Sequence, residues 1–143
     1  VPGWIDAPPG ALSEAERAAL QSYARAPTFH TDLAPTMLDM MGLWQLAELA
    51  DHQGAMVGGS LLRPGRPDQV LSLTNCSGVW GCAFENWGVM QGWRKLHARE
   101  WDRDWLCYDV QQDRQEQKPL PLESCADLVD EAVRRFKGFP GRH

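Results

Sequence analysis

The fold of this chain is decided by the stretch Cys82-Ala83-Phe84-Glu85-Asn86-Trp87-Gly88-Val89-Met90-Gln91-Gly92-Trp93, in which bulky apolar side chains are interspersed with glycines. One apolar run ends at Phe84 and a second begins at Val89. Two such runs around turn-forming residues are typical of antiparallel strands joined by a tight turn. We therefore expect Asn86 and Gly88 to adopt the left-handed backbone conformation in this turn. Glu85 is expected to accept hydrogen bonds from backbone amides there, which is a structural role.

From Gln69 onward, apolar residues recur at every second position, which is the period of a β-strand. The expected strands span about 70–74, 79–84, 89–97 and 105–110. Two of the large rings on these strands, Trp80 and Trp93, are expected in the core. A charged turn over 98–104 and a polar loop over 111–119 connect the later elements.

Three segments carry the pattern of an amphipathic helix, at about 14–25, 36–51 and 125–137. Ser13 with Glu16 forms a capping box ahead of the first helix, and Ser124 with Asp127 forms a shorter variant ahead of the last. The middle helix is apolar on most of its circumference, so we expect it to be the most buried helix.

The expected elements are N-terminal helices, a central antiparallel meander of about four strands, and a C-terminal helix packed on the sheet. This order defines an α+β fold. At this length we expect one domain over 1–143, in which the proline- and glycine-rich residues 1–12 form an irregular N-terminal arm.

The composition limits the partners and the location that we expect. A formal net charge of −5 argues against nucleic acid and favours a basic partner. No run approaches the roughly 18 apolar residues of a membrane-spanning helix, so no membrane contact is expected. The first residues lack the pattern of a secretion signal, and we expect a cytoplasmic protein. The four cysteines form no CxxC pair and lie in apolar surroundings, which favours reduced, structural thiols at Cys76, Cys82, Cys107 and Cys125.

The residues that could carry chemistry do not indicate an enzyme. No signature of a cysteine enzyme surrounds the histidines, so a catalytic Cys–His pair is not expected. Glu85 alone does not supply the two carboxylates that glycoside hydrolysis normally uses. A mixed-charge cluster over 97–104 could attract a cation, but arginines alternate with its acids, which favours a solvated turn. We expect no catalytic residue, no metal and no cofactor.

Residues 84–93 resemble a motif of the SMI1/KNR4 superfamily, also called SUKH. Members commonly carry an acidic residue and asparagine at the end of a strand, then a polar residue, glycine and valine, and then a strand with tryptophan. The positions that match are Glu85, Asn86, Gly88, Val89 and Trp93, whereas Trp87 stands where glutamine is frequent. The order of elements over about 50–137 and the stretch 61–64 are also similar to this family. The resemblance implies an α+β fold without enzymatic activity and, among bacterial members, an immunity protein that neutralises a cognate toxin.

We therefore expect a bacterial immunity protein that binds a toxin domain, expected to be basic, and blocks it. An aromatic anchor ringed by charge is a common composition of binding hot spots. The expected contact residues are Trp87, Glu100, Trp101, Asp102 and Asp104. Two alternatives stay open: a small-molecule-binding or enzymatic domain with a tryptophan-lined pocket, and a regulatory scaffold whose partner is not a toxin. A concave pocket with convergent polar groups and perturbed titrating residues would favour the first alternative, whereas a flat acidic face would favour immunity.

Overall fold

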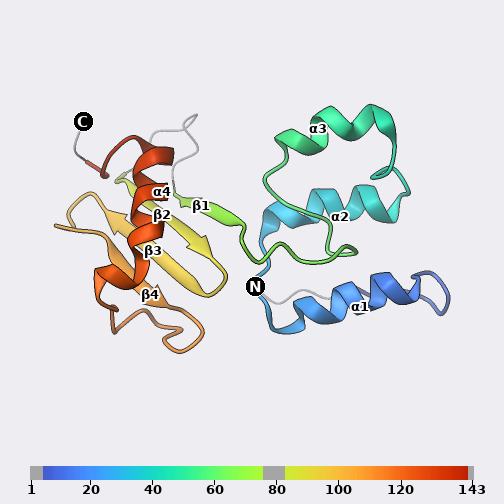
Figure 1. The fold of residues 1–143 in the computed structure, drawn as a ribbon, viewed down its shortest axis with the longest axis horizontal. Helices are drawn as coiled ribbons and strands as arrows, with labels where there is room; N and C mark the ends of the chain where they lie inside the picture. The colour runs from blue at the N-terminus through green and yellow to red at the C-terminus, as the bar shows by residue number, and fades with distance from the viewer. Residues whose placement is uncertain (1–4, 76–82, 142–143) are drawn as a thin grey trace. The chain divides into compact units, whose positions relative to one another are not determined.

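A computed structural model of the chain describes residues 5–75 and 83–141 (Figure 1). The chain divides into two compact units, Val1–Arg66 and Pro67–His143, where the sequence analysis expects one domain. We call them the N-terminal unit and the C-terminal unit. Of the expected strand over 79–84, residues 79–82 lie outside the described residues, and the described Ala83 and Phe84 precede β2 (Asn86–Gln91) and are not in a strand, so the expectation is wrong for these two; Trp80 also lies outside the described residues.

The N-terminal unit is helical. Its longest helix, α1 (Glu14–Ser22), begins with the expected capping box, in which Ser13 accepts a hydrogen bond from the backbone N–H of Glu16 and the Glu16 carboxylate accepts one from Ser13. The other α-helices and 3₁₀ turns of this unit are η1 (Tyr23–Arg25), η2 (His30–Asp32), α2 (Leu33–Met40), η3 (Ala47–Leu49) and α3 (Ala50–Ala55).

The prediction of a single helix over 36–51, the most buried one, is wrong both in the extent of the helix and in its burial. Helix α2 ends at Met40, and Gly42 then takes a positive φ of 73° that stops the helix. The buried positions of α2 include the polar Thr36 and Asp39, whereas Met37 is 63% exposed. The reason is a polar network that α2 makes inside its own unit, and this network, rather than the apolar stripe, determines which side of the helix is buried.

Asp39 is the centre of this network. Its carboxylate accepts hydrogen bonds from Ser60 at 2.6 Å and from the Arg63 guanidinium at 2.6 and 2.7 Å. Thr36 donates to the backbone carbonyl of Asp32 and accepts from the backbone N–H of Leu61. The hydrogen bonds from Arg63 are the largest influence on the pKa of Asp39, and the pKa lies below its ordinary value although burial opposes the shift.

The C-terminal unit is an antiparallel sheet with one helix across it (Figure 1). Its strands are consecutive neighbours in the order β1 (Val70–Thr74), β2 (Asn86–Gln91), β3 (Arg94–Arg99) and β4 (Leu106–Asp109). A short 3₁₀ turn, η4 (Leu122–Cys125), leads into α4 (Ala126–Phe136), which packs on the sheet. The expected α+β fold, with a meander and a C-terminal helix, is confirmed.

The tight turn is formed by Gly92 and Trp93, and not by Asn86–Gly88 as the sequence predicts. Gln91 pairs with Arg94, so Gly92 and Trp93 form a two-residue hairpin loop. Gly92 has a φ of 54°, the conformation that the first loop residue of a type II′ hairpin requires. Asn86 and Gly88 lie within β2, and neither has a positive φ. The expected strand over 89–97 is therefore wrong, because it spans the end of β2, the turn and the start of β3.

Gly88 serves a different purpose from the one the sequence suggests. A Cβ placed on it would lie 2.5 Å from the backbone oxygen of Leu96 on the neighbouring strand. The strand pair is too close there for any side chain, so glycine is required for the approach of β3 and not for a turn.

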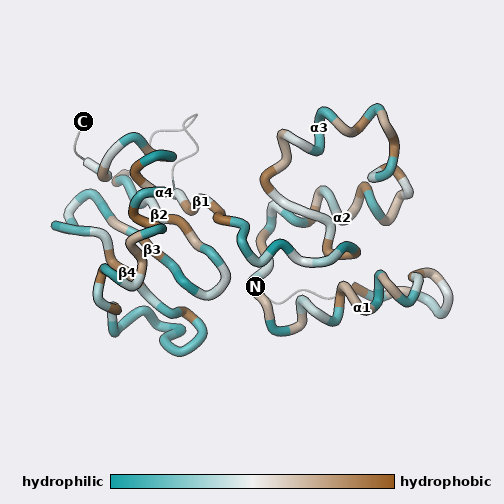
Figure 2. Tube along the Cα trace, viewed as in Figure 1, coloured by the Kyte–Doolittle hydropathy of each residue, from teal (hydrophilic) through white to brown (hydrophobic). Residues whose placement is uncertain are grey.

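One face of the sheet carries the apolar core of this unit. The side chains packed between the sheet and α4 are among the least exposed of the chain. They come from β2, β3 and α4 and are Val89, Leu96, Ala98, Leu128 and Ala132. Figure 2 shows apolar residues, in brown, along β2 and on α4. Trp93, expected in this core, is only half-buried.

A disulfide between Cys107 on β4 and Cys125 next to α4 closes the same core, and both residues are almost completely buried. The expectation of reduced thiols is therefore wrong for these two residues, while Cys76 and Cys82 lie outside the described residues. The two cysteines are 18 positions apart, and the packing of α4 on the sheet brings their Cα atoms to 6.0 Å. No local spacing rule predicts such a pair.

The expected capping box of Ser124 with Asp127 is also wrong. The residue at the N-cap of α4 is Cys125, and no side chain caps the helix. The Asp127 carboxylate instead receives two hydrogen bonds from Arg94 of β3, at 2.8 and 2.7 Å. At the other end, Lys137 takes a left-handed conformation with φ 60° and ends the helix ahead of Gly138.

Candidate functional site

Two surfaces of the C-terminal unit carry the candidate functional residues. The first is the turn between β3 and β4, residues 100–105, which holds four of the five expected contact residues. The second is the face of the sheet opposite α4, which we call the open face. Trp87 belongs to neither, because it lies on the α4 side of β2 and stacks on Phe136 of α4, with ring centroids 5.2 Å apart. That position is a packing position, separate from the other four residues.

The β3–β4 turn presents Trp101 to solvent in a supported position. More than half of Trp101 is exposed, at 56%. Its ring lies 4.9 Å from the ring of Phe84, and the Arg99 guanidinium lies 5.4 Å from its centroid. An aromatic ring that already contacts a second ring and a guanidinium loses little side-chain freedom when a partner covers it.

Two of the turn's acidic residues shape the turn itself. The Asp102 carboxylate accepts hydrogen bonds from the backbone and the side chain of Arg99, at 2.9 and 3.1 Å. Although burial raises the pKa of Asp102, these hydrogen bonds hold it below its ordinary value. The Glu100 carboxylate accepts from the backbone N–H of Glu85 at 3.0 Å. Asp104 is exposed to solvent.

Glu85 has the structural role that the sequence indicates, at a site other than a hairpin turn. Its carboxylate accepts a hydrogen bond of 2.7 Å from the backbone N–H of Gly141. Glu85 is half-buried, and it ties the segment after α4 to the start of β2. An acceptor committed to a backbone amide is poorly placed for acid–base chemistry.

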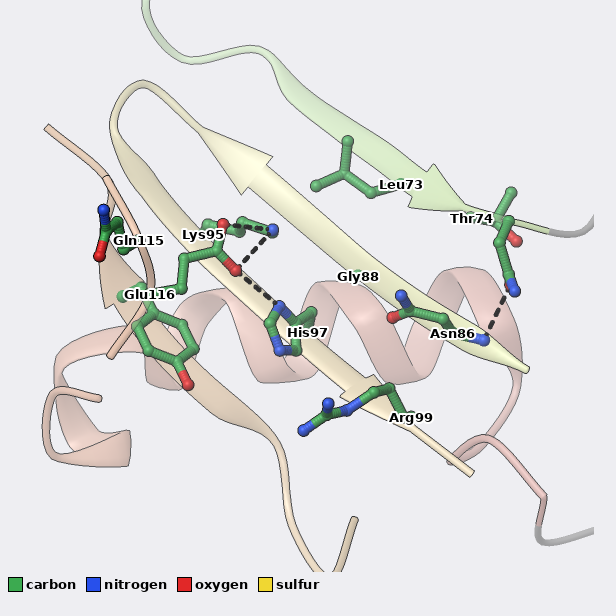
Figure 3. Close-up of a pocket in the computed structure, with 11 residues that line it drawn as sticks. Leu73, Thr74, Asn86, Gly88, Lys95, His97, Arg99, Gln115 and Glu116 are labelled. Atoms are coloured by element: carbon green, nitrogen blue, oxygen red, sulfur yellow. Dashed lines mark hydrogen bonds and ion pairs between the residues drawn. The ribbon is translucent and has the colours of Figure 1, made fainter. Parts of the chain in front are cut away.

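The open face is concave and lined by polar side chains from several elements (Figure 3). Every second residue of β3 points to this face, because successive residues of a strand alternate between the faces. The concave site has a volume of about 580 Å³. Its lining includes Leu73 and Thr74 of β1, Asn86 and Gly88 of β2, Lys95, His97 and Arg99 of β3, Tyr108 of β4, and Gln115 and Glu116 of the following loop. None of these lining residues is a tryptophan, so a tryptophan-lined pocket does not describe this site.

The loop over 111–119 supplies a carboxylate to the open face. Glu116 has a φ of 53° and extends its side chain toward β3. Its carboxylate receives two hydrogen bonds from Lys95, at 2.6 and 2.8 Å, and its Oε2 lies 3.3 Å from Nδ1 of His97. Sequence reasoning missed Glu116, because one acidic residue in a polar loop carries no periodic signal.

His97 is the titrating group at the centre of the open face. Its side chain is 17% exposed, and its ring lies 5.4 Å from that of Tyr108. Burial is the largest influence and lowers the pKa of His97, and Lys95 and Arg99 act in the same direction, while Glu116 and Asp102 oppose them. The lowered pKa leaves the imidazole mostly neutral near pH 7.

Among the residues that the structure describes, Cys107 and His97 do not form a catalytic pair. Cys107 pairs with Leu96 across the strands and faces α4, so it lies on the other side of the sheet from His97 and is tied up in the disulfide. Within residues 5–75 and 83–141, no group of three His, Cys, Asp or Glu side chains is arranged to hold a metal ion. In the same ranges no helix is long and apolar enough to cross a membrane.

The fold and this site define an α+β protein whose sheet has one helix-covered face and one polar, concave face. Comparison with protein-family models and with curated proteins gives no match. The resemblance to the SMI1/KNR4 superfamily stays a prediction that rests on residues 84–93.

Proposed function

We propose that this chain is a non-catalytic immunity protein, which binds a cognate toxin domain through the β3–β4 turn and blocks it. The observation that carries the proposal is Trp101, an exposed ring supported by Phe84 and Arg99. Large rings at a fixed position are the residues that contribute most binding energy in protein interfaces. The resemblance of 84–93 to a family of toxin-neutralising proteins points to the same function.

The contacts of the turn refine the expected set of contact residues. Asp102 and Glu100 are hydrogen-bonded within the protein, so they set the shape of the turn more than they attract a partner. Glu100 is exposed as well, but its carboxylate already accepts a hydrogen bond from Glu85, so Trp101 and Asp104 are the exposed pair that we assign to the partner. A basic toxin surface with an apolar recess fits this pair, since the recess accepts the ring and the basic rim faces Asp104.

For the location, the disulfide changes the argument. The expectation of a cytoplasmic protein rests on the missing secretion-signal pattern, whereas Cys107–Cys125 is a buried disulfide of the kind that persists in oxidising compartments. We place the protein in such a compartment, where it would meet a toxin that arrives from outside the cell. Mass spectrometry after alkylation of the protein unfolded in denaturant without reductant checks the disulfide, because alkylated Cys107 and Cys125 would contradict it.

The proposal is tested with the product of the neighbouring upstream gene, which we expect to contain the toxin domain. Co-expression of the full chain should rescue growth, and Trp101→Ala should weaken binding of that domain by tenfold or more, since removal of a hot-spot residue costs about 2 kcal/mol. A matched control is Val133→Ala, which shortens a 45% exposed side chain on α4. Affinity of Trp101→Ala equal to that of the control, measured by calorimetry, would exclude the turn as the binding surface.

A second candidate function is favoured by the open face. A concave site with convergent polar groups and a histidine of lowered pKa is the arrangement expected of a small-molecule site. The two functions use different surfaces and can coexist in one chain.

A further inference from the structure

We infer that the open face of the C-terminal unit binds a neutral, hydroxyl-rich small molecule, of the kind represented by mono- and disaccharides. The inference goes beyond the proposed toxin binding, because it concerns another surface and another class of ligand. It rests on the size of the concave site, on the pairing of its charges and on the hydrogen-bonding groups that remain.

The size of the site suits a small molecule. Its volume of about 580 Å³ falls in the range of ligand pockets, roughly 300–1,000 Å³. The floor is built from regular strands, in which Gly88 pairs with His97 and Lys95 pairs with Tyr108. Groups held by a paired sheet keep their positions without a ligand, so little ordering is required on binding.

The charges of the site are already paired within the protein. Lys95 is held by both oxygens of Glu116, and Arg99 is held by Asp102. His97 is neutral near pH 7. Within each ion pair the two opposite formal charges cancel, so the site offers neither a net positive nor a net negative centre. An anion would have to compete with Glu116 and Asp102, and a cation would have to displace Lys95.

The remaining hydrogen-bonding groups include both donors and acceptors. The Glu116 carboxylate lies 3.3 Å from Nδ1 of His97, and a neutral imidazole that carries its proton on Nδ1 would present the lone pair of Nε2 as an acceptor. The Asn86 amide, which Figure 3 shows on the same face as His97, offers a donor and an acceptor. Arg99 contacts Asp102 through Nε and Nη2, which leaves Nη1 as a donor. A hydroxyl group both donates and accepts, so adjacent hydroxyls match this mixed set better than a carboxylate or an amine does.

The experiment is an NMR titration of the ¹⁵N-labelled full chain. The probes are a panel of neutral saccharides (glucose, galactose, N-acetylglucosamine, maltose, sucrose and trehalose), with acetate, glutarate and putrescine as charged comparisons. At least one saccharide should give saturable shifts at the amides of Asn86, Gly88, His97 and Tyr108. The inference is overturned if the whole panel gives no saturable shift at these amides, or if a charged probe binds there more tightly.

Two variants link the binding to named atoms. His97→Phe keeps a ring but removes the Nε2 acceptor, and it should weaken saccharide binding by tenfold or more. Asn86→Ala, which leaves the backbone pairs of β2 intact, gives a second measurement if His97→Phe fails to fold. The control is Arg134→Gln on α4, where Arg134 contacts Glu131 on the other side of the sheet. Equal affinity of wild type and Asn86→Ala, with the shifts unchanged, would contradict the assigned contacts.

Acidification gives an independent readout on the unaltered protein. The groups that face His97 are Lys95 and Arg99 of β3, Tyr108 of β4, Glu116 of the loop and Asp102 of the turn, while β2 contributes the non-titrating Asn86 and Gly88. Protonation turns Nε2 from an acceptor into a donor, so saccharide affinity should fall as the pH drops through the lowered pKa of His97. Affinity that is constant until the protein unfolds would contradict the role of Nε2. None of these measurements involves Trp101, so their failure would leave the proposed toxin binding intact.

Discussion

The two units of this chain are stabilised in opposite ways. In the N-terminal unit, α2 buries Thr36 and Asp39 and leaves Met37 exposed. In the C-terminal unit, α4 buries Leu128 and Ala132 against the sheet and leaves Arg134 exposed. One unit is organised around a hydrogen-bonded carboxylate, and the other around an apolar core closed by a disulfide.

This difference indicates where stability and specificity come from in each unit. Apolar burial contributes free energy roughly in proportion to area, whereas a buried polar network gains little net energy and is costly to break. We therefore expect the C-terminal unit to be the more stable one. The N-terminal unit should depend on a few polar atoms.

The largest expected effect is in the apolar core. Leu128→Ala removes a side chain that is 1% exposed, and such a cavity should cost about 4 kcal/mol of the free energy of unfolding. Hydrogen exchange should accelerate at the amides of β2 and β3 and stay unchanged in α1 and α2. Val133→Ala serves as the exposed control on the same helix. Equal acceleration in both units would contradict the contrast between their cores.

The disulfide should have the next largest effect. Replacing both Cys107 and Cys125 by alanine should lower the free energy of unfolding of the C-terminal unit by about 3 kcal/mol. The reason is that the disulfide joins residues 18 positions apart and so restricts the unfolded chain. Urea unfolding followed by tryptophan fluorescence measures the loss. A change of less than about 1 kcal/mol would mean that packing of α4 alone holds this end of the sheet.

Asp39→Asn should destabilise the N-terminal unit by roughly 2 kcal/mol, because it removes the charged acceptor that Ser60 and Arg63 share. The pH dependence has a definite sign. The folded pKa of Asp39 lies below its ordinary value, so its contribution is complete above the unfolded pKa, about 3.9, and is lost as the pH falls through the folded pKa. Amide exchange in α2 between pH 6 and pH 3 should show this loss in wild type and not in Asp39→Asn.

The parts of the fold that were predictable from the sequence have local causes. The capping box at Ser13 and the strand over Val70–Thr74 are as expected, because each depends on neighbours within a few residues. The C-terminal helix and the strand Leu106–Asp109 follow from the apolar period in the same way. The predicted position of the hairpin turn is wrong because Gly88 and Gly92 look alike in the sequence. Gly88 allows two strands to approach each other, whereas Gly92 turns the chain.

The candidate site was less predictable, because its partners are distant in the sequence. Lys95 and Glu116 are 21 positions apart, and a non-glycine residue with positive φ brings the second one to the first. Trp87 was expected to contact a partner, but its stacking on Phe136 depends on where α4 crosses the sheet. The buried side of α2 depends on Ser60 and Arg63. These two residues lie outside the helix, so the apolar pattern of the helix carries no information about them.

The disulfide also determines what happens when a protease cuts the backbone between the two cysteines. The polar loop over 111–119 lies between Cys107 and Cys125, and the backbone N–H of Leu120 bonds the carbonyl of Cys107 at 2.8 Å. A protease that cleaves within this loop would separate the backbone into two fragments that remain covalently joined. The severed protein would keep β4 beside α4 and would migrate as two pieces only after reduction. Exposure of this loop to proteolysis therefore puts Glu116 and the open face at risk before it threatens the core.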